Sequence, residues 1–182
     1  EVFSEITEYL ESKQRAIQVI QLNGQNITPE DLTLTVGKMA VGEVESLKIE
    51  TASLTDLVVE ALDEIMEVIP ELPIACHELA QILVGDSPSS CFGQFNQFLE
   101  IWDVLKERQS QVIDLLGIDA AAVRVGSVTI SEHNSRLGGF TQQARGFMES
   151  SDFPALSDVL SHDLYAMAEV EETIIEALRT YV

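Results

Sequence analysis

The sequence predicts a mainly α-helical fold of the α+β class: an up-down bundle of four to five helices with a small N-terminal antiparallel β element. Residues 15–52 hold short segments in which apolar and polar residues alternate, as in half-buried strands. From residue 53 onward apolar residues recur every three or four positions, which is the pattern of one helix face. Short connections with Pro or Gly separate these helical segments, which favours two αα-hairpins with antiparallel neighbours.

The N-terminal element begins with a predicted helix over residues 1–13 and a strand over residues 16–22. This strand ends at Asn23-Gly24, a dipeptide that forms tight hairpins because both residues tolerate a positive φ. Residues 32–36 and 44–51 also alternate and complete a predicted three-stranded antiparallel sheet. Three short strands bury little apolar area, so we expect residues 1–52 to pack on an acidic helical bundle formed by residues 53–182.

The predicted helices have identifiable ends. Ser53 or Thr55 caps the first helix, and two prolines separate it from the second. Gly117 ends the third helix, and Ser127 or Ser131 is expected to cap the fourth. The predicted helices cover residues 54–69, 72–85, 91–116, 131–150 and 154–181.

The charge balance narrows the classes of partner. The chain has 31 acidic residues against 10 Lys and Arg, so its formal net charge is -21. Nucleic acids and anionic membranes are bound through basic residues, and we expect neither as a partner. A negative surface instead suits a basic or amphipathic protein partner. A homodimer that buries one sheet edge is compatible with the same pattern.

The remaining composition gives the expected location. No apolar run reaches the roughly 18–20 residues that a membrane-spanning helix needs. The two cysteines, Cys76 and Cys91, are too few for a disulfide framework and favour a reducing cytoplasm.

Polar residues inside apolar arcs mark a first candidate site. Glu171 lies near the middle of the apolar arc of the last helix, and Asp163 lies at the edge of that arc. His133 and Lys106 fall in the arcs of the fourth and third helices. If the last two helices form a hairpin with its turn near residue 152, His133 lies at the same height in the bundle as Glu171. The apolar pattern also repeats weakly at an offset of 65 residues, and this offset places Lys106 at the height of Glu171. A buried carboxylate is costly unless it is paired, so we expect His133, Lys106 or both to contact Glu171.

This polar cluster has two interpretations. It is either a satisfied polar layer that fixes the register of the helices, or a His–carboxylate pair that serves acid–base chemistry or binds a metal.

A row of acidic residues on the first helix is the second candidate site. It has three interpretations: a solvated face, a surface that docks a partner, or a metal site. The row resembles the paired-carboxylate helices of magnesium-dependent, all-helical nucleotide hydrolases, which would combine it with Glu171 and Asp163. Such enzymes also need Lys or Arg to clamp the nucleotide, and these are scarce here. The row consists of Asp56, Glu60, Asp63, Glu64 and Glu67.

No motif specific for catalysis is present: the three histidines lack the Glu of a di-iron Glu-x-x-His motif, and no glycine-rich phosphate loop occurs. We therefore expect a non-enzymatic adaptor or protein-binding module, without catalytic residues, metal or cofactor. A more specific form is a secretion or flagellar chaperone that shields an amphipathic helix of its client. The alternative is a metal-dependent hydrolase. A hydrolase needs carboxylates that converge on an open pocket, whereas an adaptor needs an exposed apolar groove or a flat acidic face.

Overall fold

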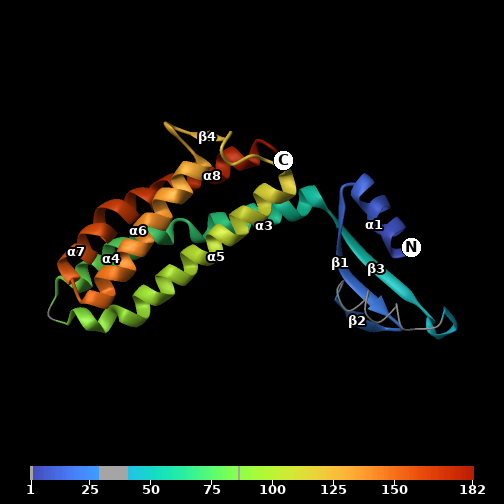
Figure 1. Cartoon of the computed structure of the whole chain (residues 1–182), viewed down its shortest axis with the longest axis horizontal. Helices are drawn as coiled ribbons and strands as arrows, with labels where there is room; N and C mark the ends of the chain where they lie inside the picture. Colours follow the sequence, from blue (N-terminus) through green and yellow to red (C-terminus); the bar gives the residue numbers. More distant parts are fainter. Residues whose placement is uncertain (1, 29–40, 86) are drawn as a thin grey trace. The chain divides into compact units, whose positions relative to one another are not determined.

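A computed structural model describes residues 2–28, 41–85 and 87–182 of the chain (Figure 1). It confirms the predicted fold class, because helices dominate and a small antiparallel three-stranded sheet accompanies them. The chain divides into two compact units, Glu1–Leu57 and Val58–Val182. The packing of the β element on the bundle stays a prediction.

The first unit contains helix α1 (Val2–Ser12) and strands β1 (Arg15–Leu22), β2 (Gln25–Ile27) and β3 (Leu47–Ser53), with a 3₁₀ turn, Val41–Glu43, before β3. The sheet order is β2-β1-β3, and both pairings are antiparallel. The predicted Asn23-Gly24 hairpin is confirmed, with φ of 50° and 80° at its two residues. The Asn23 side chain also accepts hydrogen bonds from the backbone N–H groups of Glu45 and Ser46, which ties the hairpin to the segment that enters β3.

The strands of the sheet compare with the prediction as follows. The predicted strand at residues 32–36 lies outside the described residues, and the short strand β2, which was not predicted, pairs with β1. Strand β3 begins at Leu47, later than the predicted residue 44, because the backbone N–H groups of residues 45 and 46 donate to the Asn23 side chain rather than to a strand.

Five helical segments follow β3 in the part of the chain that the structure describes (Figure 1). Helix α3 (Leu54–Val68) starts in the first unit and continues into the second, where a short turn leads to α4 (Glu71–Leu83). A 3₁₀ turn, Pro88–Cys91, precedes α5 (Phe92–Leu116), and the β4–β5 hairpin (Arg124–Val125, Val128–Thr129) precedes α6 (Ile130–Ser150). The last segment comprises α7 (Phe153–Asp158), a π-helical turn (Val159–Leu164) and α8 (Tyr165–Arg179).

The core of the second unit lies between these helices. Helix α4 packs against α7, the π turn and α8. Helix α6 packs against the same three elements. Helix α5 runs back along α3 and α4 (Figure 1). The largest fully buried side chains include Trp102 and Phe95 on α5 and Leu160 and Leu164 in the π turn. Burial of each such side chain contributes about 1.5–3 kcal/mol, so these contacts dominate the stability of the bundle.

The start of α6 corrects one sequence prediction. Thr129 caps this helix, whereas the prediction named Ser127 or Ser131. The Thr129 Oγ1 accepts a hydrogen bond from Glu132 N, and the Glu132 carboxylate accepts one from Thr129 N. This reciprocal capping box sets the start of α6 directly at the end of the β4–β5 hairpin.

The last helical segment also differs from the predicted continuous α-helix. Buried residues in its first half are spaced by four: Leu156, Leu160, Leu164 and Ala168. A regular α-helix with this spacing would rotate its apolar stripe out of the core, and the π turn corrects the rotation because it holds more residues than an α turn. The register of α8 therefore depends on this π turn.

Candidate functional site

The structure brings three of the four residues of the predicted polar cluster together. Glu171 of α8 is fully buried, and its Oε1 lies 2.5 Å from Lys106 Nζ of α5 and 2.8 Å from His133 Nε2 of α6. Gln109, one turn after Lys106, donates from Nε2 to Glu171 Oε2 at 2.8 Å and accepts from Lys106 Nζ at 2.9 Å. The cluster thus joins three helices through one carboxylate.

Burial, charge and hydrogen bonds shift the pKa values of Glu171 and Lys106 in this cluster. Burial raises the pKa of the Glu171 carboxyl, but the hydrogen bond from His133 and the charge and hydrogen bond of Lys106 outweigh this effect and hold the pKa below its ordinary value. Burial lowers the pKa of the Lys106 ammonium, and the attraction of Glu171 offsets only part of that effect. Because the ionised carboxylate only accepts, His133 Nε2 carries the hydrogen and donates it.

Asp163 is not part of the cluster, which corrects the predicted membership. It lies in the π turn and is partly exposed, and no hydrogen bond or ion pair joins it to Glu171 in the described ranges. The physical reason is the extra residue of the π turn. Positions before the turn are rotated relative to those after it, so a projection with constant α-helical spacing places Asp163 wrongly.

The cluster has the geometry of a structural polar layer. His133 and Glu171 are 1% and 0% exposed, and neither lines the two adjoining cavities at Ile101 or the cavity at Ile17. The carboxylate oxygens are occupied by three donors from the protein itself. The arrangement therefore favours the interpretation of the cluster as a polar layer that fixes the register of α5, α6 and α8.

All five residues of the acidic row on α3 are exposed, but they differ in their ion pairing. Asp63 forms an ion pair with Arg179 of α8. Glu64 lies 3.5 Å from Arg108 of α5. The remaining acidic residues of the row, Asp56, Glu60 and Glu67, form no ion pair with any residue that the structure describes.

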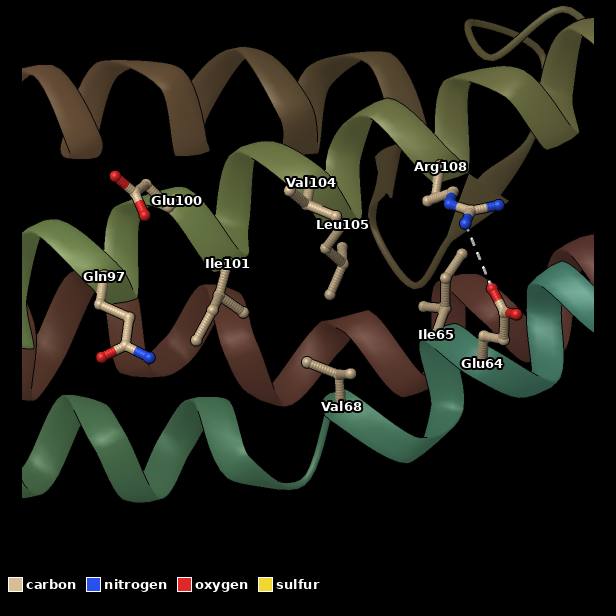
Figure 2. A pocket seen from close by; sticks show the side chains of 9 residues that line it. All are labelled: Glu64, Ile65, Val68, Gln97, Glu100, Ile101, Val104, Leu105 and Arg108. Atoms are coloured by element: carbon tan, nitrogen blue, oxygen red, sulfur yellow. Dashed lines mark ion pairs between the residues drawn. The ribbon is translucent and has the colours of Figure 1, made fainter.

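An open apolar groove lies between α3–α4 and α5, and Glu64 stands at its rim. Two adjoining cavities, of about 450 and 230 Å³, form the groove and share Val68, Gln97 and Ile101. Figure 2 shows Ile101 of α5 and Val68 of α3 facing one another across it. The floor is formed by the buried residues Ile65, Leu72, Leu79, Phe98 and Leu105.

The walls of this groove expose apolar side chains to solvent. Val68, Ile101 and Val104 are 39%, 37% and 59% exposed. Single exposed apolar residues are ordinary on protein surfaces, whereas several that converge on one hollow mark a binding site.

The rim of the groove is acidic. Glu71 and Glu78 stand on the α4 side and Glu100 on the α5 side, and none of the three forms an ion pair within the described part of the chain. The basic residue at the rim, Arg108, is paired with Glu64 at one end of the groove (Figure 2). The groove thus presents an apolar floor between acidic edges.

Sequence reasoning missed the groove residues of α5. Ile101 and Val104 fall outside the apolar arc that holds Trp102 and Leu105, and a single-helix projection assigns such positions to solvent. One signal was available, because Gln94, Ile101 and Arg108 are spaced by seven residues, as are Gln97 and Val104. Spacing by seven indicates a helix face that meets further helices.

No three His, Cys, Asp or Glu side chains are grouped as metal ligands among the residues that the structure describes. None of the helices in the described ranges combines the length and apolar character that crossing a membrane requires. Comparison of the chain with protein-family models, curated proteins and solved structures found no match. Any statement about function therefore depends on the geometry alone.

Proposed function

We propose that the chain is a non-enzymatic protein-binding module whose α3–α4/α5 groove holds a basic or amphipathic segment of a protein partner. The observation that carries this proposal is the convergence of Val68, Ile101 and Val104 in one open, acid-rimmed groove. In a chaperone-like form of this role, the module would cover an apolar surface that its client must keep from water, as proposed above for a secretion or flagellar client.

Burial of the groove supplies the driving force for association. Apolar area removed from water contributes roughly 25 cal/mol per Å². The floor of the groove is already packed, so a partner needs to cover only the walls, and little reorganisation of this chain opposes binding.

The acidic rim makes the groove selective for basic partners. A net charge of -21 attracts a basic partner over a Debye length of about 8–10 Å and repels acidic ones. The same charge opposes association of the groove with a second copy of this chain, because both rims would carry the same sign.

The thiols support a cytoplasmic, non-catalytic protein. Cys76 and Cys91 are both free and buried. Burial raises the pKa of Cys76 to about 12, so this thiol does not ionise at neutral pH. Free thiols suit a reducing compartment, and we place the protein in the cytoplasm.

The hydrolase alternative finds no supporting geometry among the described residues. It needs Glu171, Asp163 and the acidic row of α3 to converge on an open pocket. Glu171 is fully buried and is bound by Lys106, His133 and Gln109, while the five residues of the row are exposed. No observation therefore favours this second function.

A matched pair of variants tests the proposal. Ile101→Ser removes an apolar wall of the groove, and Ile74→Ser alters an isoleucine of α4 that is 50% exposed and does not line the groove. Ile and Ser have similar helix propensities, so neither change should alter folding by that route. We expect partner capture from a lysate of the source organism to fall about tenfold for Ile101→Ser and to be unchanged for Ile74→Ser, measured by quantitative mass spectrometry. Equal capture by both variants would contradict the proposal.

A further inference from the structure

The spacing of the groove residues points to the structure of the bound segment. Two apolar rows run along the α3–α4 side, and each repeats every seven residues. The rows are Ile65, Leu72 and Leu79, and Val68, Ala75 and Ile82. A seven-residue repeat corresponds to 3.5 residues per turn, which is the periodicity of helices that coil around one another.

The repeat continues across the junction between α3 and α4. Pro70 adopts α-helical angles, with φ -61° and ψ -23°. The backbone N–H of Ile69 bonds to Ile65 O at 3.2 Å, and that of Leu72 bonds to Ile69 O at 3.1 Å. The turn is short and hydrogen-bonded, and Val68 of α3 and Leu72 of α4 line the same cavity, so the two helices form one wall.

The α5 wall shows the same spacing with a mixed composition. All of its groove residues except Glu100 fall into three seven-spaced sets, of which only the last is apolar throughout: Gln94, Ile101 and Arg108; Gln97 and Val104; and Phe98 and Leu105. From Gln94 to Arg108 this wall is about 21 Å long at 1.5 Å per residue. Two walls that share one heptad periodicity over this length complement a third helix with the same periodicity.

We infer that the partner segment is a single α-helix with a heptad apolar repeat, at least two heptads long, which docks in the groove as an additional helix of a left-handed coiled arrangement. This inference deepens the proposed function and depends on it. Apolar side chains at the a and d positions of the segment would lie between Val68, Ile101 and Val104. The crossing angle expected for such packing is about 20°.

The acidic rims of the groove favour basic residues on both sides of the apolar stripe of the docked helix. On the α3–α4 wall Glu64, Glu71 and Glu78 form a third seven-spaced row, and Glu100 stands on the α5 wall. Residues that flank the a and d positions of a coiled helix meet the rims of the neighbouring helices. Lys or Arg at these e and g positions would pair with Glu71, Glu78 and Glu100.

The test uses synthetic peptides of about three heptads as probes, at concentrations where each peptide alone is monomeric. The first has Leu at a and d and Lys at e and g. The second has the same composition with Leu at alternate positions, and the third has Glu in place of Lys. We expect the first peptide to bind the full chain at least about tenfold more tightly than either control, measured by fluorescence anisotropy, and to lose about tenfold in affinity with Ile101→Ser but not with Ile74→Ser.

Three results would overturn the inference. The first is equal binding of the heptad and alternating peptides, which would mean attraction by charge alone. The second is binding that Ile101→Ser does not weaken. The third is sedimentation of the chain alone as a dimer that Ile101→Ser dissociates, which would make a second copy the occupant of the groove. If the peptides fail while partner capture still depends on Ile101, the proposed function stands and only the helical form of the segment is wrong.

Discussion

Replacing Glu171 with alanine is expected to destabilise the bundle by about 3–5 kcal/mol, measured by urea unfolding at pH 7. The carboxylate is the common acceptor for Lys106, Gln109 and His133. Its removal leaves the half-buried ammonium of Lys106 and the donors of Gln109 and His133 without this acceptor, at a cost that exceeds the loss of the contacts themselves. The neighbouring Glu172→Ala is the control, because Glu172 is exposed on the same helix and its loss should cost no more than about 0.5 kcal/mol.

Acidification provides a second readout of the same variant. Because its partners hold the pKa of folded Glu171 below that of the unfolded chain, the carboxylate stabilises the fold fully above the ordinary carboxyl pKa. This stabilisation is lost as the pH falls through the lowered pKa. The difference between wild type and Glu171→Ala should therefore shrink in acid. A variant as stable as Glu172→Ala at pH 7 would show that the cluster does not hold the helices together.

Replacing the whole cluster by apolar residues is expected to recover most of this loss. The quadruple variant Lys106→Met, Gln109→Leu, His133→Leu and Glu171→Leu keeps similar side-chain volumes and leaves no buried donor or acceptor behind. Buried ion pairs replaced in this way are often neutral or stabilising, so we expect its free energy of unfolding to lie within about 2 kcal/mol of wild type. The measurement is the same urea titration.

The quadruple variant distinguishes an effect of the cluster on stability from an effect on the packing of the helices. A stable protein with lost near-ultraviolet dichroism would show that the polar layer fixes the register of α5, α6 and α8. A variant as unstable as Glu171→Ala would contradict the view that unpaired donors cause the loss, since it contains none of them.

The cluster and the groove are connected through α5. Lys106 and Gln109 face α6 and α8, while Ile101, Val104 and Arg108 face the groove. We therefore expect the polar layer to influence the rotation of α5, the helix that forms one wall of the groove. A change in the cluster that rotates α5 would move Ile101 and Val104 away from Val68.

The sequence was sufficient for the features that depend on one helix at a time. Helix α5 was predicted at residues 91–116 and occupies Phe92–Leu116, because its apolar stripe and its terminal Gly117 define it locally. Glu171 was recognised as a polar residue in an apolar arc. His133 was predicted as its partner because a hairpin turn near residue 152 places the two residues at the same height. Asp163 was misplaced because the segment was projected as a regular α-helix, although the four-residue spacing of Leu156, Leu160 and Leu164 accompanies a π turn that packs on α4 and α6.

The groove, which α3–α4 and α5 form together, was not predicted. Val68 and Ile101 lie far apart in the sequence, and each by itself is an ordinary exposed apolar residue. Only the side-by-side placement of α3–α4 and α5 makes them opposite walls of one groove (Figure 2). The β4–β5 hairpin was ambiguous in the sequence because its two strands have only two residues each, too few to show an alternating pattern.

Site-specific photo-crosslinking in cells tests the occupancy of the groove most directly. A benzophenone amino acid replaces Val104, which is 59% exposed in the groove wall, and, as the control, Ile74, which is 50% exposed outside it. The account predicts that Val104 cross-links to one segment of a different protein, with Lys or Arg flanking its apolar residues, and that Ile74 does not. Cross-links from Val104 only to this chain, or the same products from both positions, would contradict it.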